Sequence, residues 1–155
     1  MFIAFLGASA LVLVLLAVAV LLVLRRRMVA VTVEGSSMEP AYTAGDRVLV
    51  RRVPFGLIRA GQAVVIERPE PGGWVGPPDN RRMAARNWMI KRVVACPGDP
   101  VSRDDFPVLA DQPGTWVPAD RLLVRGDNPG VSYDSRHVGY IPAERVLGVV
   151  ARRIG

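Results

Sequence analysis

The chain opens with an unbroken hydrophobic segment, residues 1–24, in which Gly7 and Ser9 are the weakly polar positions. A helix over residues 2–24, rising about 1.5 Å per residue, would extend roughly 34 Å, and the hydrocarbon core of a bilayer is about 30 Å thick. The segment is longer than the hydrophobic part of a cleaved secretory signal, and no basic residue precedes it. We therefore predict one transmembrane anchor with a basic flank, residues 1–27, and keep a cleaved signal as the alternative.

Beyond residue 27 the hydrophobic positions fall into short runs typical of β-strands. The runs are rich in β-branched residues or alternate with polar ones, and Gly, Pro, Asp or Asn bounds each of them. The predicted strands cover residues 28–33, 47–53, 63–67, 88–95, 122–125 and 146–151. Two stretches rich in Pro, Gly or Asp, residues 68–87 and 97–118, cannot continue a central strand and are predicted as surface excursions. Residues 28–155 suffice for one hydrophobic core, so we predict a single, mainly β domain with little helix.

The net charge of the chain is +6, and three arginines follow the predicted anchor directly. This distribution favours contact with anionic lipid headgroups. The other basic residues are scattered, for example as the pairs at 51–52, 81–82 and 152–153, with no aromatic-rich strand motif of the RNA-binding kind among them. We therefore predict contact with membrane lipid and no nucleic-acid partner.

Cys96 and His137 are each the sole residue of their type in the sequence. A single cysteine excludes an intramolecular disulfide, and together with a single histidine it leaves almost no ligands for a catalytic metal. Cys96 ends a hydrophobic run, as a small core residue would. We predict neither a metal nor another cofactor.

Lys91 is the sole lysine among the 20 basic residues of the chain. An arginine cannot lose its proton in a protein, whereas a lysine can when burial lowers its pKa. Strand alternation places Lys91 on one face with Met89, Val93 and Ala95, and that face is otherwise hydrophobic. Half-deprotonation near pH 7.5 needs a pKa about 3 units below its ordinary value of about 10.4, which desolvation can supply. Lys91 is thus a candidate general base, and the alternative is an edge lysine whose ammonium lies in water.

Two polar segments could work with such a base. Ser37 follows small residues at the end of the first predicted strand, and Pro40 restricts the backbone that leaves it, so Ser37 is a candidate nucleophile. Further on, in the turn-rich residues 126–136, Asp134 and Arg136 can pair and Ser132 can hydrogen-bond an amine. Taken one at a time, a common Ser-Ser turn and a solvated loop are the alternatives.

Together the three segments resemble type I signal peptidases, the Ser/Lys peptidases that remove secretory leader peptides. Residues 37–40 look like the nucleophile box, residues 91–94 followed by 97–99 look like the lysine box, and residues 126–136 are similar to the last box. The order and spacing match a compact member of the family with a single anchor, over residues 31–150. The resemblance implies a domain of antiparallel β-sheets.

The resemblance also implies a role for each matching residue. Ser37 matches the nucleophile and Lys91 its general base. Ser132 matches the hydroxyl that orients the base, and Asp134 and Arg136 match a supporting ion pair.

Pockets and departures from the family pattern follow from the same comparison of motifs. Shallow pockets for small residues at the first and third positions before the cut are expected at Val31, Val33, Met38 and Ile90. Gly35 stands where some relatives carry a side-chain oxyanion donor, so the oxyanion is expected to rest on backbone N–H groups, chiefly that of Ser37. Gln62 stands where relatives commonly have Asp, which we interpret as a structural difference.

We therefore predict a membrane-bound serine endopeptidase that cleaves leader peptides after Ala-X-Ala, with neutral Lys91 taking the Ser37 proton. The predicted location is the cell membrane, with residues 28–155 outside the cytoplasm. Arg25, Arg26 and Arg27 favour the opposite orientation by the positive-inside rule. The alternative is a dedicated pro-segment peptidase at the cytoplasmic face, like the nickel superoxide dismutase maturation proteases.

Two further alternatives differ in chemistry. A Ser-His-Asp enzyme would use Ser37, His137 and one of the aspartates. A non-catalytic, membrane-tethered β module would bind anionic lipid or a partner, with Ser37 and Lys91 incidental.

Overall fold

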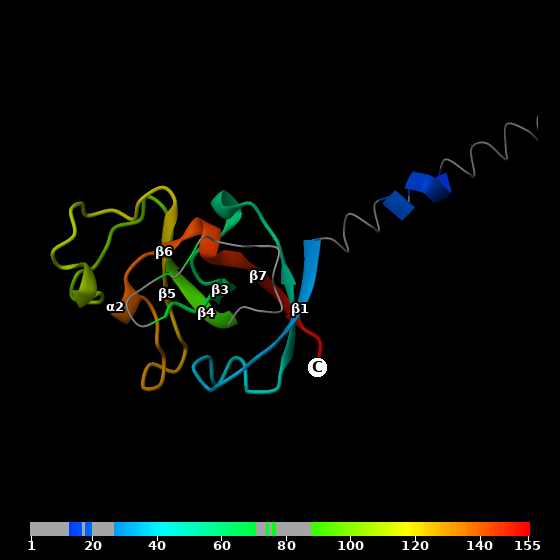
Figure 1. Ribbon diagram of the computed structural model, residues 1–155, viewed down its shortest axis with the longest axis horizontal. Coiled ribbons are helices and arrows are strands. Elements are labelled where there is room, and N and C mark those ends of the chain that lie inside the picture. The colour runs from blue at the N-terminus through cyan, green and yellow to red at the C-terminus, as the bar shows by residue number, and fades with distance from the viewer. Residues whose placement is uncertain (1–12, 17, 20–26, 71–73, 75, 77–87) are drawn as a thin grey trace, which may run out of the picture.

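Seven strands form one antiparallel sheet (Figure 1). The computed structural model describes residues 13–16, 18–19, 27–70, 74, 76 and 88–155. Within this part of the chain the strands are β1 (Met28–Thr32), β2 (Arg47–Arg51), β3 (Ala63–Glu67), β4 (Trp88–Ala95), β5 (Arg121–Arg125), β6 (Ile141–Pro142) and β7 (Val146–Arg153). They lie in the order β1-β2-β7-β3-β4-β5-β6, and every neighbouring pair is antiparallel. The prediction of a mainly β, antiparallel domain is confirmed.

Helical structure in the described domain is limited to short elements. They are the 3-10 turns η1 (Phe55–Leu57), η3 (Pro107–Leu109) and η4 (Ala143–Arg145), and the single-turn helix α2 (Ser135–Val138). Asp134 caps α2, accepting a hydrogen bond from the Arg136 N–H. This cap matters for the site because it fixes the carboxylate that Ser132 contacts.

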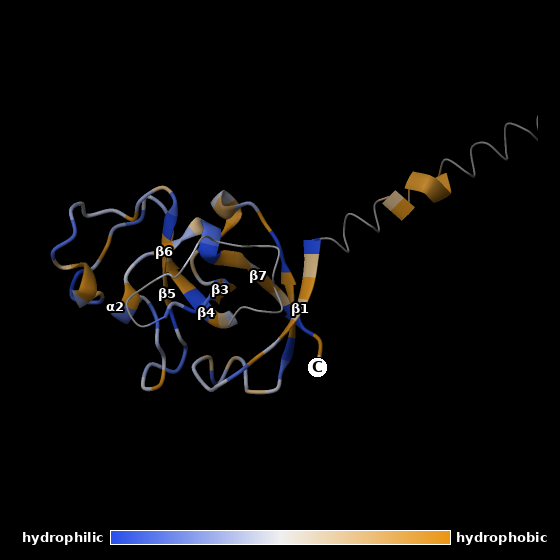
Figure 2. Cartoon of the chain, viewed as in Figure 1, coloured by the Kyte–Doolittle hydropathy of each residue, from blue (hydrophilic) through white to orange (hydrophobic). Residues whose placement is uncertain are grey.

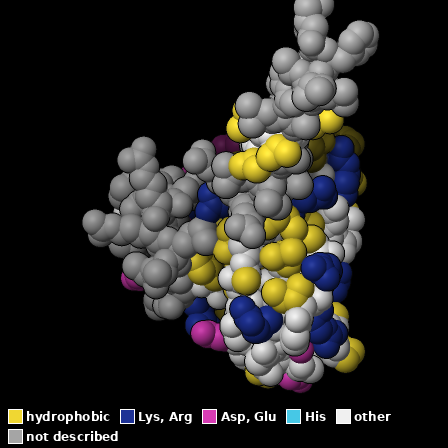
Figure 3. All heavy atoms as spheres, turned by 90° about the vertical axis from the view of Figure 1, so that its right-hand side faces the viewer, with side chains coloured by type: hydrophobic (Ala, Val, Ile, Leu, Met, Phe, Trp, Pro, Cys, Tyr) yellow, Lys and Arg dark blue, Asp and Glu magenta, His cyan; other side chains and the backbone are white. Residues whose placement is uncertain are grey.

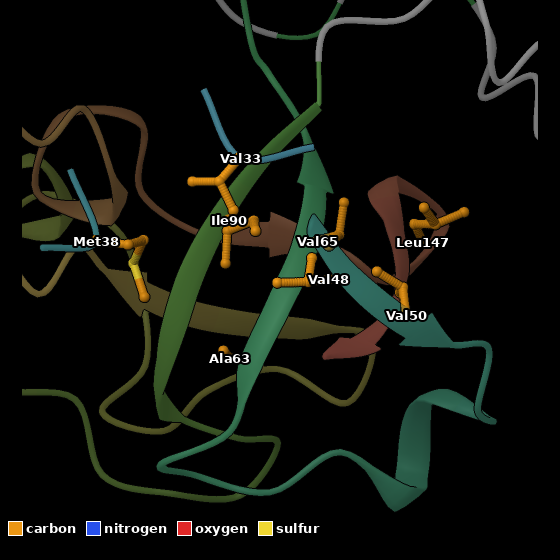
Figure 4. Close-up of a cluster of buried hydrophobic side chains, with 8 residues drawn as sticks. All are labelled: Val33, Met38, Val48, Val50, Ala63, Val65, Ile90 and Leu147. Carbon is orange, nitrogen blue, oxygen red and sulfur yellow. The ribbon is translucent and has the colours of Figure 1, made fainter. Parts of the chain in front are cut away.

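The sheet is curved, and hydrophobic side chains pack against both of its faces. Val65 belongs to one buried cluster, shown in Figure 4 with Val33, Met38 and Ile90, while the adjacent Val64 belongs to a second. Because successive side chains point to opposite faces of a strand, β3 is buried on both sides. Register shifts in the pairs β2–β7, β3–β7 and β4–β5 bend the strands. The hydrophobic strands and polar connections are visible in Figure 2.

The predicted anchor, residues 1–27, lies largely outside the described residues. Residues 13–16 and 18–19 are helical and hydrophobic (Figure 2). Among the residues that the structure describes, no helix is long and apolar enough to cross a membrane.

The predicted surface excursions differ in how much of them is described. Most of residues 71–87 lies outside the described part of the chain. The excursion over residues 97–118 contains η3 and an isolated bridge between Pro100 and Trp116, and Phe106 and Leu109 bury a third small cluster beneath it.

The segment that follows β1 turns back against the end of the sheet. The Val33 N–H donates to the Asp46 carbonyl at 2.8 Å, and the Val33 carbonyl accepts the Gly45 N–H at 3.0 Å. Strand β5 pairs with β4 only from Arg92 onward. The first half of β4, with Lys91 at its end, therefore lies beside the segment that carries Ser37 and not beside β5.

Candidate active site

Lys91 Nζ lies 2.6 Å from Ser37 Oγ, although 54 positions separate the two residues in the sequence. Ser37 is positioned by the turn after β1, where the next side chain, Met38, is 2% exposed and packs in the first core cluster. Lys91 is positioned by β4, and two of its neighbours along the strand, Met89 and Val93, pack in the second core cluster. The predicted nucleophile and base are thus brought to hydrogen-bonding distance by tertiary packing.

The Lys91 amine lies in a water-poor environment. Its residue is 2% exposed, and desolvation by burial lowers the pKa of the amine from 10.5 to about 8, partly opposed by the negative charge of Asp134. The cations Arg68 and Arg136 lower this pKa further. A substantial fraction of the amine is therefore neutral at pH values near 8, as a general base must be.

Ser132 and Asp134 continue the hydrogen-bonded chain from Lys91. Lys91 Nζ lies 3.1 Å from Ser132 Oγ, and the Ser132 hydroxyl donates to Asp134 Oδ2 at 2.7 Å. Asp134 is fully buried and also accepts hydrogen bonds from the Gly126 N–H and from Arg136 Nε, both at 2.9 Å. Burial alone would raise the pKa of Asp134, but these hydrogen bonds, led by that from Arg136, hold it well below its usual range. The carboxylate therefore stays ionised and can only accept.

A second ion pair, which the sequence analysis did not predict although both residues lie in matched boxes, joins β4 to the loop after β5. Arg92 Nε donates to Asp127 Oδ1 at 2.7 Å, and a second guanidinium nitrogen donates to Oδ2 at 2.5 Å. Next along the loop, the Asn128 N–H donates to the Ser37 carbonyl at 3.0 Å. The residues following Lys91 and Asp127 thus hold the two sides of the site together.

Gly126 lies where a side chain would not fit. A Cβ atom there would overlap the Ser132 side chain and the carbonyl of Ser37. The loop after β5 can therefore approach the Ser37 backbone this closely only with glycine at this position.

An open cavity of about 250 Å³ lies over the Ser37–Lys91 pair. Its walls include Glu34 and Gly35, which precede Ser36 and Ser37 in the chain, Arg68 after β3, and Val131 and Tyr133 on either side of Ser132. Gly35 has a φ of 74°, and no atom lies within 4 Å of where its Cβ would be. The cavity is wide enough for a peptide side chain to lie next to the Ser37 hydroxyl.

The residues predicted to form substrate pockets belong to the hydrophobic core and are not among the described residues that line this cavity. Val33, Met38 and Ile90 are at most 5% exposed and belong to the first core cluster (Figure 4). Val31 is partly buried and packs against that cluster. Their contribution to substrate binding stays a prediction. Gln62 accepts a hydrogen bond from the Arg59 N–H at 3.0 Å, which gives it a place in the turn before β3.

His137 contacts Tyr133 and Asp134, and no hydrogen bond joins it to Ser37 in the described part of the chain. Its ring stacks on Tyr133 with a centroid distance of 5.2 Å, and Nδ1 accepts the Asp134 N–H at 3.4 Å. The atom beside Ser37 Oγ is Lys91 Nζ. This arrangement disfavours a Ser-His-Asp triad. Among the described residues, no three His, Cys, Asp or Glu side chains are grouped as a metal site would need.

The geometry of the site agrees with what comparison of the whole sequence shows. The family model described as "Signal peptidase, peptidase S26" matches residues 6–113 and 103–154. The chain is 31% identical over 134 residues to "Signal peptidase I" of Leptolyngbya laminosa, with 75% of this chain and 63% of that protein covered. It is 30% identical over 135 residues to "Probable signal peptidase I-2" of Synechocystis sp., with 75% and 58% covered.

A third relative comes from a eukaryote. The chain is 29% identical over 126 residues to the "Mitochondrial ATP-independent inner membrane protease subunit 1a" of Arabidopsis thaliana, with 79% of this chain and 67% of that protein covered. The matched region is thus less than two thirds of the length of the two bacterial relatives. A match along nearly the whole chain, together with these identities, shows that the chain belongs to the type I signal peptidases, peptidase family S26.

Proposed function

We propose that this protein is a membrane-anchored serine endopeptidase that cleaves leader peptides after small residues of the Ala-X-Ala type. Ser37 is the nucleophile and Lys91 its general base. The observation that carries the proposal is the 2.6 Å distance between Lys91 Nζ and Ser37 Oγ at an amine that is almost fully buried. Family membership supports the reaction class.

The hydrogen-bonded chain gives a direction for each proton. Ionised Asp134 can only accept, so the Ser132 hydroxyl donates to it and presents a lone pair to Lys91. Neutral Lys91 donates one N–H to Ser132, which leaves its nitrogen lone pair for the Ser37 hydroxyl. Ser132 and Asp134 are therefore positioning residues, and Arg136 balances the Asp134 charge.

The reaction then follows from these positions. Ser37 Oγ attacks the scissile carbonyl as its proton passes to Lys91 Nζ, and the resulting ammonium returns that proton to the leaving amine as the C–N bond breaks. A water molecule then loses a proton to Lys91 as it attacks the ester, and Lys91 returns that proton to Ser37 Oγ as the ester C–O bond breaks. The N–H of Ser37 has no acceptor among the described residues, so it is available to the oxyanion. β4 pairs with β3 along its first half, but β5 pairs with β4 only from Arg92 onward, so the other edge of β4 before Arg92 is where an extended substrate can lie.

Residues 1–27 form the anchor and residues 28–155 the catalytic domain in this proposal. The side of the domain that carries β1 presents hydrophobic and arginine side chains together (Figure 3), and Arg47, Arg51 and Arg152 on neighbouring strands are exposed. Such a surface favours anionic lipid. We place the domain outside the cytoplasm, and the three arginines after the anchor make the cytoplasmic pro-segment peptidase the second candidate.

Cleavage of a precursor with an Ala-X-Ala leader tests the proposal. Ser37→Ala and Lys91→Arg should each abolish cleavage, because the first lacks the nucleophile and the second a side chain that can deprotonate. Ser102→Ala, a serine in the distant excursion, is the matched control. Turnover near that of the unmodified protein in either variant would overturn the assignment.

Two further measurements separate the alternatives. A penem-type acylating inhibitor should label Ser37 in the intact protein and not in Ser37→Ala; absence of labelling would favour a non-catalytic lipid-binding module. Protease added to intact cells should digest a C-terminal tag if the domain is outside, and a protected tag would favour the cytoplasmic pro-segment peptidase.

A further inference from the structure

The charged side chains around the Ser37–Lys91 pair are largely neutralised in pairs. Arg92 forms a two-pronged ion pair with Asp127, and Arg136 forms another with Asp134. Arg68 differs from both arginines. It lines the cavity over the pair, and no hydrogen bond or ion pair joins its guanidinium to another residue in the described part of the chain. Its positive charge is therefore available to a ligand in the cavity.

The backbone on either side of Arg68 is held firmly. The preceding residue, Glu67, pairs with Arg145 at 2.9 Å, and Arg145 is 5% exposed with its guanidinium 5.4 Å from the Trp74 ring. The following residue, Pro69, is buried and restricts Arg68 to an extended backbone. The backbone of Arg68 is thus held in place by its neighbours, and its side chain lines the cavity.

Arg68 also lies close enough to the reacting groups to affect them. Its charge acts on the Lys91 amine through the shared cavity, which Met89 of β4 lines as well. An extended peptide advances about 3.3 Å per residue, so a substrate side chain that reaches Arg68 belongs to a residue near the scissile bond.

We propose that Arg68 is a specificity residue that binds a carboxylate side chain of the peptide substrate within three residues of the scissile bond. The guanidinium can grip a carboxylate with two parallel hydrogen bonds, and the partly enclosed cavity strengthens them relative to open water. The inference rests on the proposed function in one respect: it takes the Ser37 cavity as the site where the peptide is bound. It names the substrate class more narrowly, as precursors with Asp or Glu beside the cleavage site.

Glu34, on the cavity wall just before Gly35, carries the opposite charge and would favour basic substrate residues. If Arg68 made no contact with the substrate, Glu34 would set the charge preference of the cavity, and basic peptides would bind better than acidic ones. The sign of the charge preference is therefore a direct test.

Peptide binding is measured on the full-length Ser37→Ala protein. Binding does not require a nucleophile, so this measurement tests the inference independently of catalysis. The probes are peptides with an Ala-X-Ala site in which Gln is replaced by Glu, one position at a time, over three residues on each side. At one position Glu should tighten binding roughly tenfold over Gln. In Ser37→Ala/Arg68→Gln this preference should disappear, in Ser37→Ala/Arg68→Lys it should partly remain, and in Ser37→Ala/Arg68→Glu it should pass to Lys at the same position.

Ser37→Ala/Arg121→Gln, which changes a half-buried arginine of β5 paired with Asp120, is the control and should keep the tenfold preference. No Glu preference at any position, or a preference that survives Arg68→Gln, would overturn the inference. In the protein with Ser37 intact, at a pH well above 8 where the Lys91 amine is neutral, the same Glu should lower KM and leave kcat almost unchanged, since the ion pair forms equally in the bound ground state. Failure to cleave any peptide, with the binding preference intact, would count against the proposed function and not against Arg68.

Discussion

At the scale of single residues, the protonation of Lys91 sets the expected pH dependence. Burial lowers the pKa of the amine to about 8, and the base must be neutral to accept the Ser37 proton. We expect kcat/KM to rise about tenfold per pH unit below this value and to level off above it. Steady-state cleavage of a leader peptide between pH 6 and 10 measures the profile. A rising limb centred near 6.5, the ordinary histidine range, would contradict the role of Lys91.

Asp134 acts on the same amine through its charge and through Ser132. Its negative charge raises the pKa of Lys91, so Asp134→Asn should move the rising limb to lower pH. The same change weakens the orientation of Ser132 and should lower the plateau roughly 10²-fold. A purely structural role would lower the plateau without moving the limb, so the two readouts of one pH profile distinguish the roles.

Gly126 offers a steric test of the same geometry. In Gly126→Ala the new methyl group must displace Ser132 or the Ser37 carbonyl, so we expect kcat to fall roughly 10²-fold. Gly130→Ala in the same loop is the matched control, because the nearest atom to its added Cβ lies 4.0 Å away. Equal activity of the two variants would contradict the close approach of the loop to the nucleophile.

At the scale of elements, the strands could be predicted because each is marked locally. Ala63–Glu67 and Trp88–Ala95 have the predicted bounds, and Met28–Thr32 ends one residue earlier than predicted. The two-residue strand β6 was not predicted, because Pro142 and the short run around Ile141 carry no period-2 pattern. It forms because β5 supplies its pairing partner, which local sequence does not reveal.

The site divides in the same way. Ser37, Lys91 and Ser132 could be chosen from residue type and motif order, and the single lysine was a strong signal. Arg92 and Asp127 lie within two of the matched boxes, but their pairing across 35 positions was not predicted, because the motifs do not show which of their charges meet. Arg68 was likewise one arginine among many, because its place in the cavity depends on how β3 ends. The motifs do not predict which residues far apart in the sequence come into contact, and both of these features depend on such contacts.

The Arg92–Asp127 pair gives a prediction for the junction of β4 with the loop after β5. Asp127→Ala leaves Arg92 with the Gly61 carbonyl as its remaining described partner, and should lower the free energy of unfolding by about 1 kcal/mol. Activity should also fall, since Asn128 next to it holds the Ser37 carbonyl. Asp105→Ala breaks the more exposed pair with Arg125 and should change neither by much. Urea unfolding and leader cleavage, measured on both variants, check the prediction.

At the scale of the whole molecule, the site joins three distant parts of the chain. Lys91 lies 54 positions from Ser37 and 41 from Ser132, and the three side chains meet where the first and second core clusters border the loop after β5. The folded domain therefore holds an amine in surroundings that disfavour its charge. Burying this amine lowers the free energy of unfolding at pH values where the amine is protonated.

Lys91→Met measures that cost. Below about pH 8 the amine is protonated in both the folded and unfolded states, and the folded state alone carries the desolvation penalty, so the variant should be more stable than the unmodified protein at pH 7. The gain should be about 2 kcal/mol, after allowance for the hydrogen bonds lost at Ser37 and Ser132. Between about 8 and 10.5 the folded protein releases its proton before the unfolded chain does, so the stability of the unmodified protein rises and the gap narrows. Urea unfolding of both proteins at pH 7, 8 and 9.5 gives the difference in their free energies of unfolding. A difference that stays constant over this range, or a variant less stable at pH 7, would show that burying the charged Lys91 amine does not destabilise the fold.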